Sequence, residues 1–178
     1  MGPLKAGDTV LALDVGEVRI GLARGEIGAP FVFGRGTLTR CGRLSDDVAA
    51  VAAAAAAERA VMLVVGLPVR AHGGDSAQTR RVRDFAAALH AAGHAVELLD
   101  ERFTTALAQR QVATSGMPRA KRREKGRLDE AAAIAILETY LARRASAQAD
   151  AASAAATGAA ASDPAPGAAA TSGEDGAP

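Results

Sequence analysis

At residues 10–23 the chain reads Val10-Leu11-Ala12-Leu13-Asp14-Val15-Gly16-Glu17-Val18-Arg19-Ile20-Gly21-Leu22-Ala23. The apolar run at its start is typical of a β-strand buried on both faces, and one carboxylate, Asp14, interrupts the run where the strand should end. Gly16 permits a tight turn, and residues 19–23 predict a returning strand. The stretch therefore predicts a β-hairpin with an acid at its mouth.

Two interpretations of Asp14 are open from this stretch alone. A buried carboxylate without compensation costs several kcal/mol or stays protonated, so a functional Asp14 requires a partner charge or a bound cation. Alternatively, Asp14 accepts hydrogen bonds from the backbone of its own turn. The two interpretations differ in what the rest of the chain must bring to the strand end.

Length and composition restrict the class of protein. The 178 residues suit one domain with a full core, and the single cysteine, Cys41, excludes an internal disulfide and a cysteine-based zinc site. No run approaches the roughly 18 apolar residues of a membrane span, and the N-terminus lacks the basic and apolar pattern of an export signal. We therefore expect a cytoplasmic protein that does not bind membranes.

The composition changes at residue 145. Residues 145–178 lack Leu, Ile, Val, Phe, Met, Lys and Arg, so they cannot bury enough apolar surface to offset chain entropy. We expect a folded domain at residues 1–144 and a disordered tail at 145–178, in which the alanines of 145–157 can extend the preceding helix. The folded part holds all 21 basic residues and 16 of the 20 acids, a net charge near +5 that is compatible with a polyanionic partner.

Periodicity and glycine or proline punctuation predict the elements of the folded part. The expected strands are residues 9–15, 19–23, 31–39, 61–65 and 95–99, and the expected helices are 44–58, one around 82–93, 104–114 and 128–143. Right-handed crossovers would place strands 61–65 and 95–99 parallel to the first strand. We therefore predict an α/β fold whose mixed five-stranded sheet has three antiparallel strands, then two parallel ones, and is flanked by helices.

Three carboxylates stand where this topology can bring them to one rim. Asp14 and Glu101 follow strands, and Asp129 is expected to open the last helix. Each acid also has a structural explanation: Asp129 can cap its helix, Glu101 can pair with Arg102, and Asp14 can bond its own turn. Gathered together, they would repel one another unless Mg²⁺ or Mn²⁺ lay between them. Such an arrangement can polarise a phosphodiester and activate water.

The sequence resembles the YqgF/RuvX family, bacterial proteins of the ribonuclease H-like superfamily that are related to the Holliday junction resolvase RuvC and regarded as candidate nucleases for pre-16S rRNA. The resemblance covers residues 9–143 in four collinear blocks. The blocks are Leu13-Asp14-Val15-Gly16 through Arg19-Ile20-Gly21-Leu22-Ala23, Val65-Gly66-Leu67-Pro68 followed by Gly74, Asp100-Glu101-Arg102 followed by Thr104-Thr105, and Asp129 followed by Ala131-Ala132. It implies a ribonuclease H-like fold and a metal-dependent phosphodiesterase whose catalytic acids are Asp14, Glu101 and Asp129, with Asp100 as a further candidate.

Basic residues near the predicted rim are candidates for contact with nucleic acid. They are Arg19, Arg102, Arg119, Lys121, Arg122, Arg123, Lys125 and Arg127. The run from Arg119 to Arg127 immediately precedes Asp129, which favours phosphate contact, although such a run can equally be a solvated connector. His72 follows Gly66-Leu67-Pro68 and is left without a role.

The expected function is hydrolysis of phosphodiester bonds in structured nucleic acid, in the processing of pre-16S rRNA. One alternative is a Holliday junction resolvase or DNA-repair nuclease, which would need two active sites and hence a dimer. Another is a nucleic-acid-binding or ribosome-assembly factor without turnover. A nucleotide site like that of actin-like sugar kinases is a further alternative, but such a site lies between two domains and the folded part of this chain supplies one. The sequence leaves open an rRNA precursor or branched or single-stranded DNA as substrate, and a monomer or a homodimer as the oligomeric state.

Overall fold

The computed structural model describes residues 3–68, 76–101 and 122–160, and the side chains of 122–127 and 155–160 are outside this description. The chain divides into two compact units, residues 1–145 and 146–178. The sheet, the core and the candidate site all belong to the first unit.

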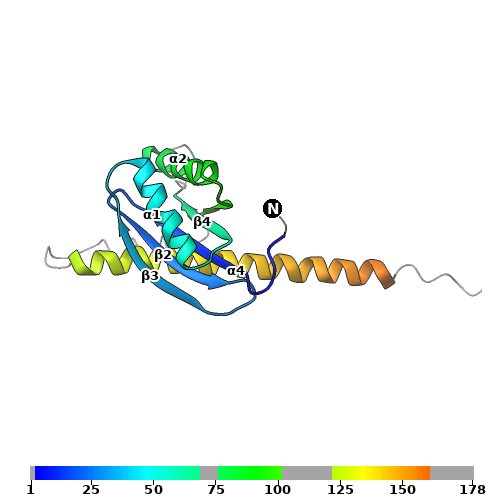
Figure 1. Cartoon of the computed structure of the whole chain (residues 1–178). Helices are drawn as coiled ribbons and strands as arrows, with labels where there is room; N and C mark the ends of the chain where they lie inside the picture. The colour runs from blue at the N-terminus through cyan, green and yellow to red at the C-terminus, as the bar shows by residue number, and fades with distance from the viewer. Residues whose placement is uncertain (1–2, 69–75, 102–121, 161–178) are drawn as a thin grey trace, which may run out of the picture. The chain divides into compact units, whose positions relative to one another are not determined.

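Five strands form one mixed sheet in the order β3-β2-β1-β4-β5 (Figure 1). Their bounds are β1 Thr9–Val15, β2 Arg19–Glu26, β3 Val32–Thr39, β4 Met62–Leu67 and β5 Val96–Asp100. The pairs β1–β2 and β2–β3 are antiparallel, whereas β4 pairs in parallel with both β1 and β5. The predicted α/β fold, with a mixed five-stranded sheet of three antiparallel strands and then two parallel ones, is confirmed.

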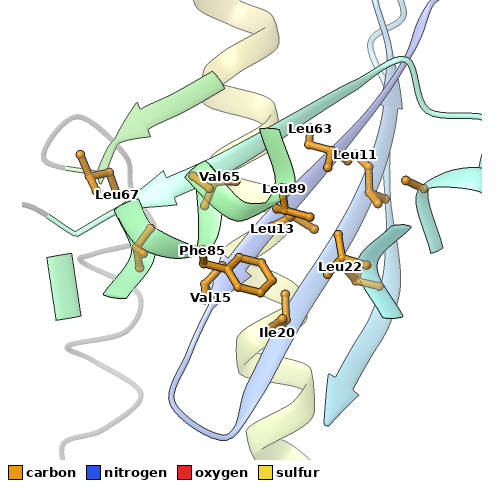
Figure 2. Close-up of a cluster of buried hydrophobic side chains, with 14 residues drawn as sticks. Leu11, Leu13, Val15, Ile20, Leu22, Leu63, Val65, Leu67, Phe85 and Leu89 are labelled. Carbon is orange, nitrogen blue, oxygen red and sulfur yellow. The ribbon is translucent and has the colours of Figure 1, made fainter. Parts of the chain in front are cut away.

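Helices cover both faces of the sheet because its central strands are apolar on both sides. Helices α1 (Leu44–Ala57) and α2 (Ala77–Ala91) contribute Val51, Phe85 and Leu89 to a core with Leu11, Leu13 and Val15 of β1 (Figure 2). On the opposite face, α4 (Arg122–Ala160) packs against Val10 and Ala12 of the same strand. Successive side chains of a strand alternate between faces, so Asp14 lies on the face that α4 covers.

Helix α4 lies directly on the sheet because glycines remove the side chains beneath it. A Cβ atom on Gly21 would overlap the backbone of Asp129, and one on Gly34 would overlap the side chain of Glu130. Replacing either glycine by a larger residue would push the helix away from the strands. The glycines of β2 and β3 therefore determine how close α4 comes to β1 and to Asp14.

The last helix of the chain differs from the sequence-based prediction. The final helix begins at Arg122, so the predicted start at Leu128 was wrong, and Asp129 lies inside the helix rather than at its start. Arg, Glu and Lys are strong helix formers, and this propensity carries the helix through the basic run despite Gly126. The predicted helix at 104–114 falls outside the described residues.

Helix α4 also continues beyond the core, to Ala160. The alanine-rich composition of residues 145–160 favours this extension. The rest of the expected disordered tail, residues 161–178, falls outside the described ranges, so its disorder stays a prediction. Within the described ranges, no helix combines the length and apolarity needed to span a membrane.

Candidate active site

The candidate site is built on one row of residues that crosses the sheet. Asp14 of β1 is paired with Gly21 of β2. On its other side, the β1–β4 register pairs Leu13 with Val65, so the next residue of β4, Gly66, adjoins Asp14. Asp14 is only 4% exposed and stands between two residues without side chains. The missing side chains therefore let groups from outside the sheet pack beside the carboxylate of Asp14.

Glu101 occupies the space over Gly66. It directly follows β5, is 2% exposed, and its Oε1 would lie 2.5 Å from a Cβ atom placed on Gly66. Burial raises the pKa of Glu101 to about 7, and repulsion from the neighbouring carboxylate of Asp100 adds to the effect. Glu101 is therefore divided between its neutral and charged forms near neutral pH.

Asp129, from α4, lies over the same face of the sheet as Glu101 but at the β2 end of the row. Its backbone carbonyl oxygen packs against Gly21, the residue paired with Asp14. Its carboxylate makes an ion pair with Arg19, whose Nε lies 2.8 Å from Oδ2 of Asp129. The backbone of Asp129 thus lies at the predicted row, while its side chain is engaged by an arginine of β2.

The fold brings the three predicted acids to one edge, but their side chains do not form a preassembled ligand cluster. Among the described residues, which include all three acids, no group of three His, Cys, Asp or Glu side chains is arranged to hold a metal ion. Like charges separate when no cation lies between them, and Arg19 offers Asp129 a different partner. Metal ligation by Asp14, Glu101 and Asp129 stays a prediction.

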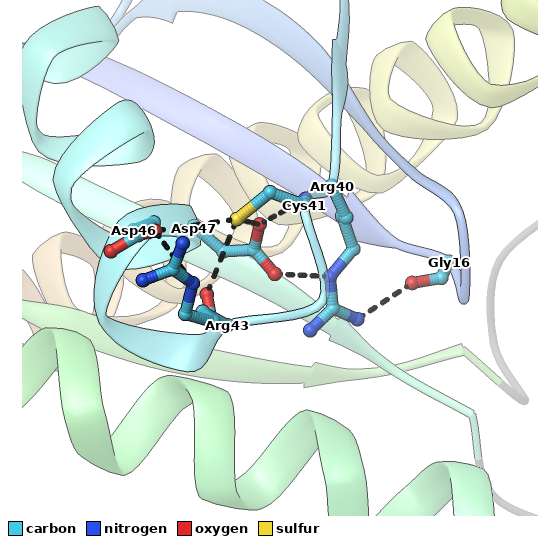
Figure 3. A network of polar contacts seen from close by, with 6 residues as sticks. All are labelled: Gly16, Arg40, Cys41, Arg43, Asp46 and Asp47. Carbon is cyan, nitrogen blue, oxygen red and sulfur yellow. Dashed lines mark hydrogen bonds and ion pairs between the residues drawn. The ribbon is translucent and has the colours of Figure 1, made fainter.

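A polar network that the sequence did not reveal supports the turn after Asp14 (Figure 3). The guanidinium of Arg40 donates from Nε to Oδ2 of Asp47 at 2.7 Å and from an Nη atom to the carbonyl of Gly16 at 2.9 Å. Oδ1 of Asp47 also accepts from the backbone N–H of Cys41 at 3.0 Å. Burial alone would raise the pKa of Asp47, but these hydrogen bonds and the charge of Arg40 lower it. The network joins β3 and α1 to the hairpin that carries Asp14.

Glu130 is a second residue that sequence reasoning missed. Its Oε1 accepts a hydrogen bond from the backbone N–H of Gly36 at 2.8 Å, and its side chain crosses Gly34. Gly36 has a φ of +72°, a conformation that favours glycine. The available signal was weak: a carboxylate directly after Asp129, and two glycines spaced by two on one strand. Glu130, the residue after Asp129, thus anchors this part of α4 to β3.

Most of the basic residues that the sequence predicts to contact nucleic acid lie outside the described side chains. Arg19 lies at the site, as stated above. Arg102, Arg119, Lys121 and His72 are outside the described residues, and Arg122, Arg123, Lys125 and Arg127 fall in the first turns of α4 without described side chains. Their proposed contact with nucleic acid stays a prediction.

Comparison with known proteins gives this site its context. The sequence profile of the RuvX family, described as Holliday junction resolvase, matches residues 8–143. The chain belongs to the RuvX family. The predicted resemblance and the predicted nuclease activity are thereby confirmed, and this RuvX protein is a nuclease that acts on nucleic acid.

Several relatives of this RuvX protein carry related names. A Thermus thermophilus protein named as a candidate pre-16S rRNA nuclease is 52% identical, over 74% of this chain and 96% of its own. A Deinococcus radiodurans protein named ribonuclease YqgF is 42% identical, over 76% of this chain and 88% of its own. Among solved structures, RuvC of T. thermophilus in complex with a Holliday junction substrate is similar with a TM-score of 0.46 and 18% identity, covering 78% of this chain and 96% of its own.

Proposed function

We propose that this RuvX protein is a divalent-metal-dependent nuclease that hydrolyses phosphodiester bonds in the precursor of 16S rRNA. The observation that carries the proposal is the position of Asp14, buried between Gly21 and Gly66, with Glu101 over one glycine and Asp129 against the other. The substrate is inferred from the names of relatives such as the one that is 52% identical.

The residues at this row fit a divalent cation. Asp14, Glu101 and Asp129 would hold it through carboxylate oxygens, the ligands preferred by Mg²⁺ and Mn²⁺. The glycines at positions 21 and 66 let Asp129 and Glu101 approach the strand that carries Asp14. When bound, the ion would stabilise the negative charge that develops at phosphorus and favour deprotonation of the attacking water.

The chain's own residues prepare that chemistry in two ways. Asp14 lies on a strand that is paired on both sides, so the sheet sets the backbone position of this carboxylate before substrate arrives. Glu101 has a pKa of about 7, so a cation that binds it near neutral pH displaces a proton from part of the population. Cation binding should therefore strengthen as the pH rises through neutrality.

A second candidate substrate is branched DNA. The description of the RuvX family as Holliday junction resolvase favours it. Cutting a four-way junction symmetrically needs two active sites, so this function requires a homodimer, whereas cleavage of an rRNA precursor does not. Sedimentation at the concentration used for cleavage separates the two requirements.

We also place the protein in the cytoplasm, because the thiol of Cys41 is free and exposed, as is usual in a reducing compartment.

The test is cleavage by the purified full chain of three substrates: a pre-16S rRNA fragment, single-stranded DNA and a four-way junction. We expect cleavage of the RNA only when Mg²⁺ or Mn²⁺ is present. Asp14→Asn should abolish it while leaving the melting temperature nearly unchanged, and Asp84→Asn, at an exposed position of α2, should leave cleavage unaltered. Cleavage retained by Asp14→Asn would contradict the assignment of the site, and cleavage of the junction alone would favour the second candidate. Binding without any cleavage would indicate an assembly factor.

A further inference from the structure

The ion pair between Arg19 and Asp129 joins positions 110 residues apart along the chain. Arg19 and Gly21 lie on the same face of β2, the face that α4 covers, because they are two residues apart on one strand. The guanidinium of Arg19 therefore extends toward α4 beside the row that holds Asp14. The side chains of Arg19 and Asp129 are 24% and 29% exposed, so the pair is partly shielded from solvent.

The charges at this edge explain why an arginine is placed there. Asp14 and Glu101 are buried at this edge with little solvent to screen them, and Asp129 packs beside the same row. Arg19 engages Oδ2 of Asp129, and a cation held by this carboxylate would draw on the same negative charge. A guanidinium and a divalent cation repel each other, so each weakens the other's interaction with one shared carboxylate. Binding of the ion at Asp129 must therefore weaken the bond to Arg19.

We propose that Arg19 is an internal counter-cation for Asp129, and that a divalent ion displaces it and so releases its guanidinium to bind a phosphate of the substrate. This inference rests on the proposed function, since it takes Asp129 as a ligand of the ion. It assigns Arg19 two successive partners, a carboxylate before the ion binds and a phosphate afterwards. The planar guanidinium suits both, because each can accept paired N–H donors.

The exchange has two measurable consequences. Arg19 competes with the ion, so the protein binds divalent cations more weakly than its carboxylates alone would allow. The ion also strengthens phosphate binding by freeing Arg19, and reciprocity requires that nucleic acid strengthens binding of the ion by the same factor.

The same hairpin provides a matched control. Arg81 of α2 pairs with Glu17 at 2.7 Å, at the turn between β1 and β2, and both side chains are exposed. Arg81→Gln removes one positive charge and one ion pair that involves this hairpin, as Arg19→Gln does, but away from Asp129. A difference between the two variants therefore reports on the place of Arg19 and not on net charge.

The experiment is a calorimetric titration of the full chain with Mn²⁺, without nucleic acid. We expect Arg19→Gln to bind Mn²⁺ roughly fivefold more tightly than the unaltered chain, about the strength of a partly exposed ion pair. Arg81→Gln should match the unaltered chain. Arg19→Lys keeps the positive charge but loses the Nε contact, so its affinity for Mn²⁺ should lie between those of the unaltered chain and Arg19→Gln. It provides a second variant if Arg19→Gln folds poorly.

The coupling between ion binding and nucleic-acid binding is measured as the affinity for an RNA oligonucleotide with and without Ca²⁺. Ca²⁺ serves as the divalent ion in these binding measurements. We expect Ca²⁺ to raise the affinity of the unaltered chain for RNA, and this increase to shrink at least severalfold in Arg19→Gln. Unchanged or weaker Mn²⁺ binding by both Arg19 variants would overturn the inference, as would equal tightening in Arg81→Gln. Absence of Mn²⁺ binding by the unaltered chain would instead contradict the proposed function.

Discussion

The carboxyl group of Glu101 lies over Gly66, with its Oε1 at 2.5 Å from the place that a Cβ atom on this glycine would take. Gly66 is the next-to-last residue of β4 and adjoins Asp14, so it gives Glu101 access to the row. The space left by the absent Cβ atom also accommodates Cδ1 of Ile136 from α4. One glycine thus lets an acid and a core side chain reach the sheet together.

Gly66→Ala should lower both stability and cation affinity. The added methyl overlaps Ile136 and Glu101, and overpacking of this kind costs about 1–3 kcal/mol. Urea denaturation measures the first effect and Mn²⁺ titration the second. Adding Ile136→Val removes the overlapping Cδ1, so the double variant should regain stability but not cation affinity. If cation affinity returns as well, Gly66 acts through core packing and not through Glu101.

Glu101→Gln should change how stability depends on pH. The pKa of Glu101 is raised from 4.5 to about 7, so between these values the folded chain binds more protons than the unfolded one. Stability contributed by this group is therefore full below pH 4.5 and is lost as the pH rises through 7. At pH 8 without metal, the variant should be more stable by up to about 3 kcal/mol, since one pKa unit corresponds to about 1.4 kcal/mol.

Urea denaturation at pH 5 and pH 8 checks this expectation, with Glu138→Gln, at an exposed position of α4, as the control. The difference between Glu101→Gln and the unaltered chain should grow with pH, and Mg²⁺ should reduce it by binding the charged carboxylate. A difference independent of pH would show that the pKa of Glu101 is not raised by folding.

Arg40→Met should destabilise the fold by about 2–4 kcal/mol. It leaves Asp47, whose side chain is buried, without its cationic partner and removes the bond to the carbonyl of Gly16. Because the pKa of Asp47 is lowered in the folded chain, its contribution is present above 3.8 and is lost as the pH falls below that value. The cost of Arg40→Met should therefore diminish in acid, as thermal denaturation at pH 7 and pH 3 can measure.

A neighbouring arginine provides the control for this prediction. Arg43 pairs with Asp46 at 3.4 Å on the surface of the same helix start, so Arg43→Met should change stability by less than about 0.5 kcal/mol. Equal effects of the two substitutions would mean that the bond to Gly16 does not support the hairpin.

Glu130→Ala should reduce nuclease activity more than Glu130→Gln. Alanine removes the acceptor for the N–H of Gly36, whereas the amide oxygen of glutamine can still take that hydrogen bond. The loss of anchoring lets α4 shift over Gly34 and misplaces Asp129, which we expect to lower kcat by about tenfold or more. Comparable loss in both variants would indicate that the charge of Glu130, and not its hydrogen bond, matters. Glu138→Ala, at an exposed position further along α4, should behave as the unaltered chain.

Much of the fold could be read from local patterns. Strand β1 has the predicted bounds, Thr9–Val15, because a continuous apolar run ended by a glycine turn carries its own signal. Helix α4 was predicted with a late start because the basic run resembles a solvated loop, and helix propensity proved stronger there. The family resemblance likewise depended on short blocks that are visible in the sequence.

The amino-acid sequence by itself determined the five strands and how they pair, since these follow from hydrophobic periodicity and from short motifs, and it selected Asp14, Glu101 and Asp129 as the candidate acids. Only the tertiary structure decided what each acid meets: Arg19 at Asp129, Gly66 beneath Glu101, and Gly16 held by Arg40. Such contacts join residues far apart in the chain. They depend on strand register and on how closely a helix can approach glycine positions, which no local pattern encodes.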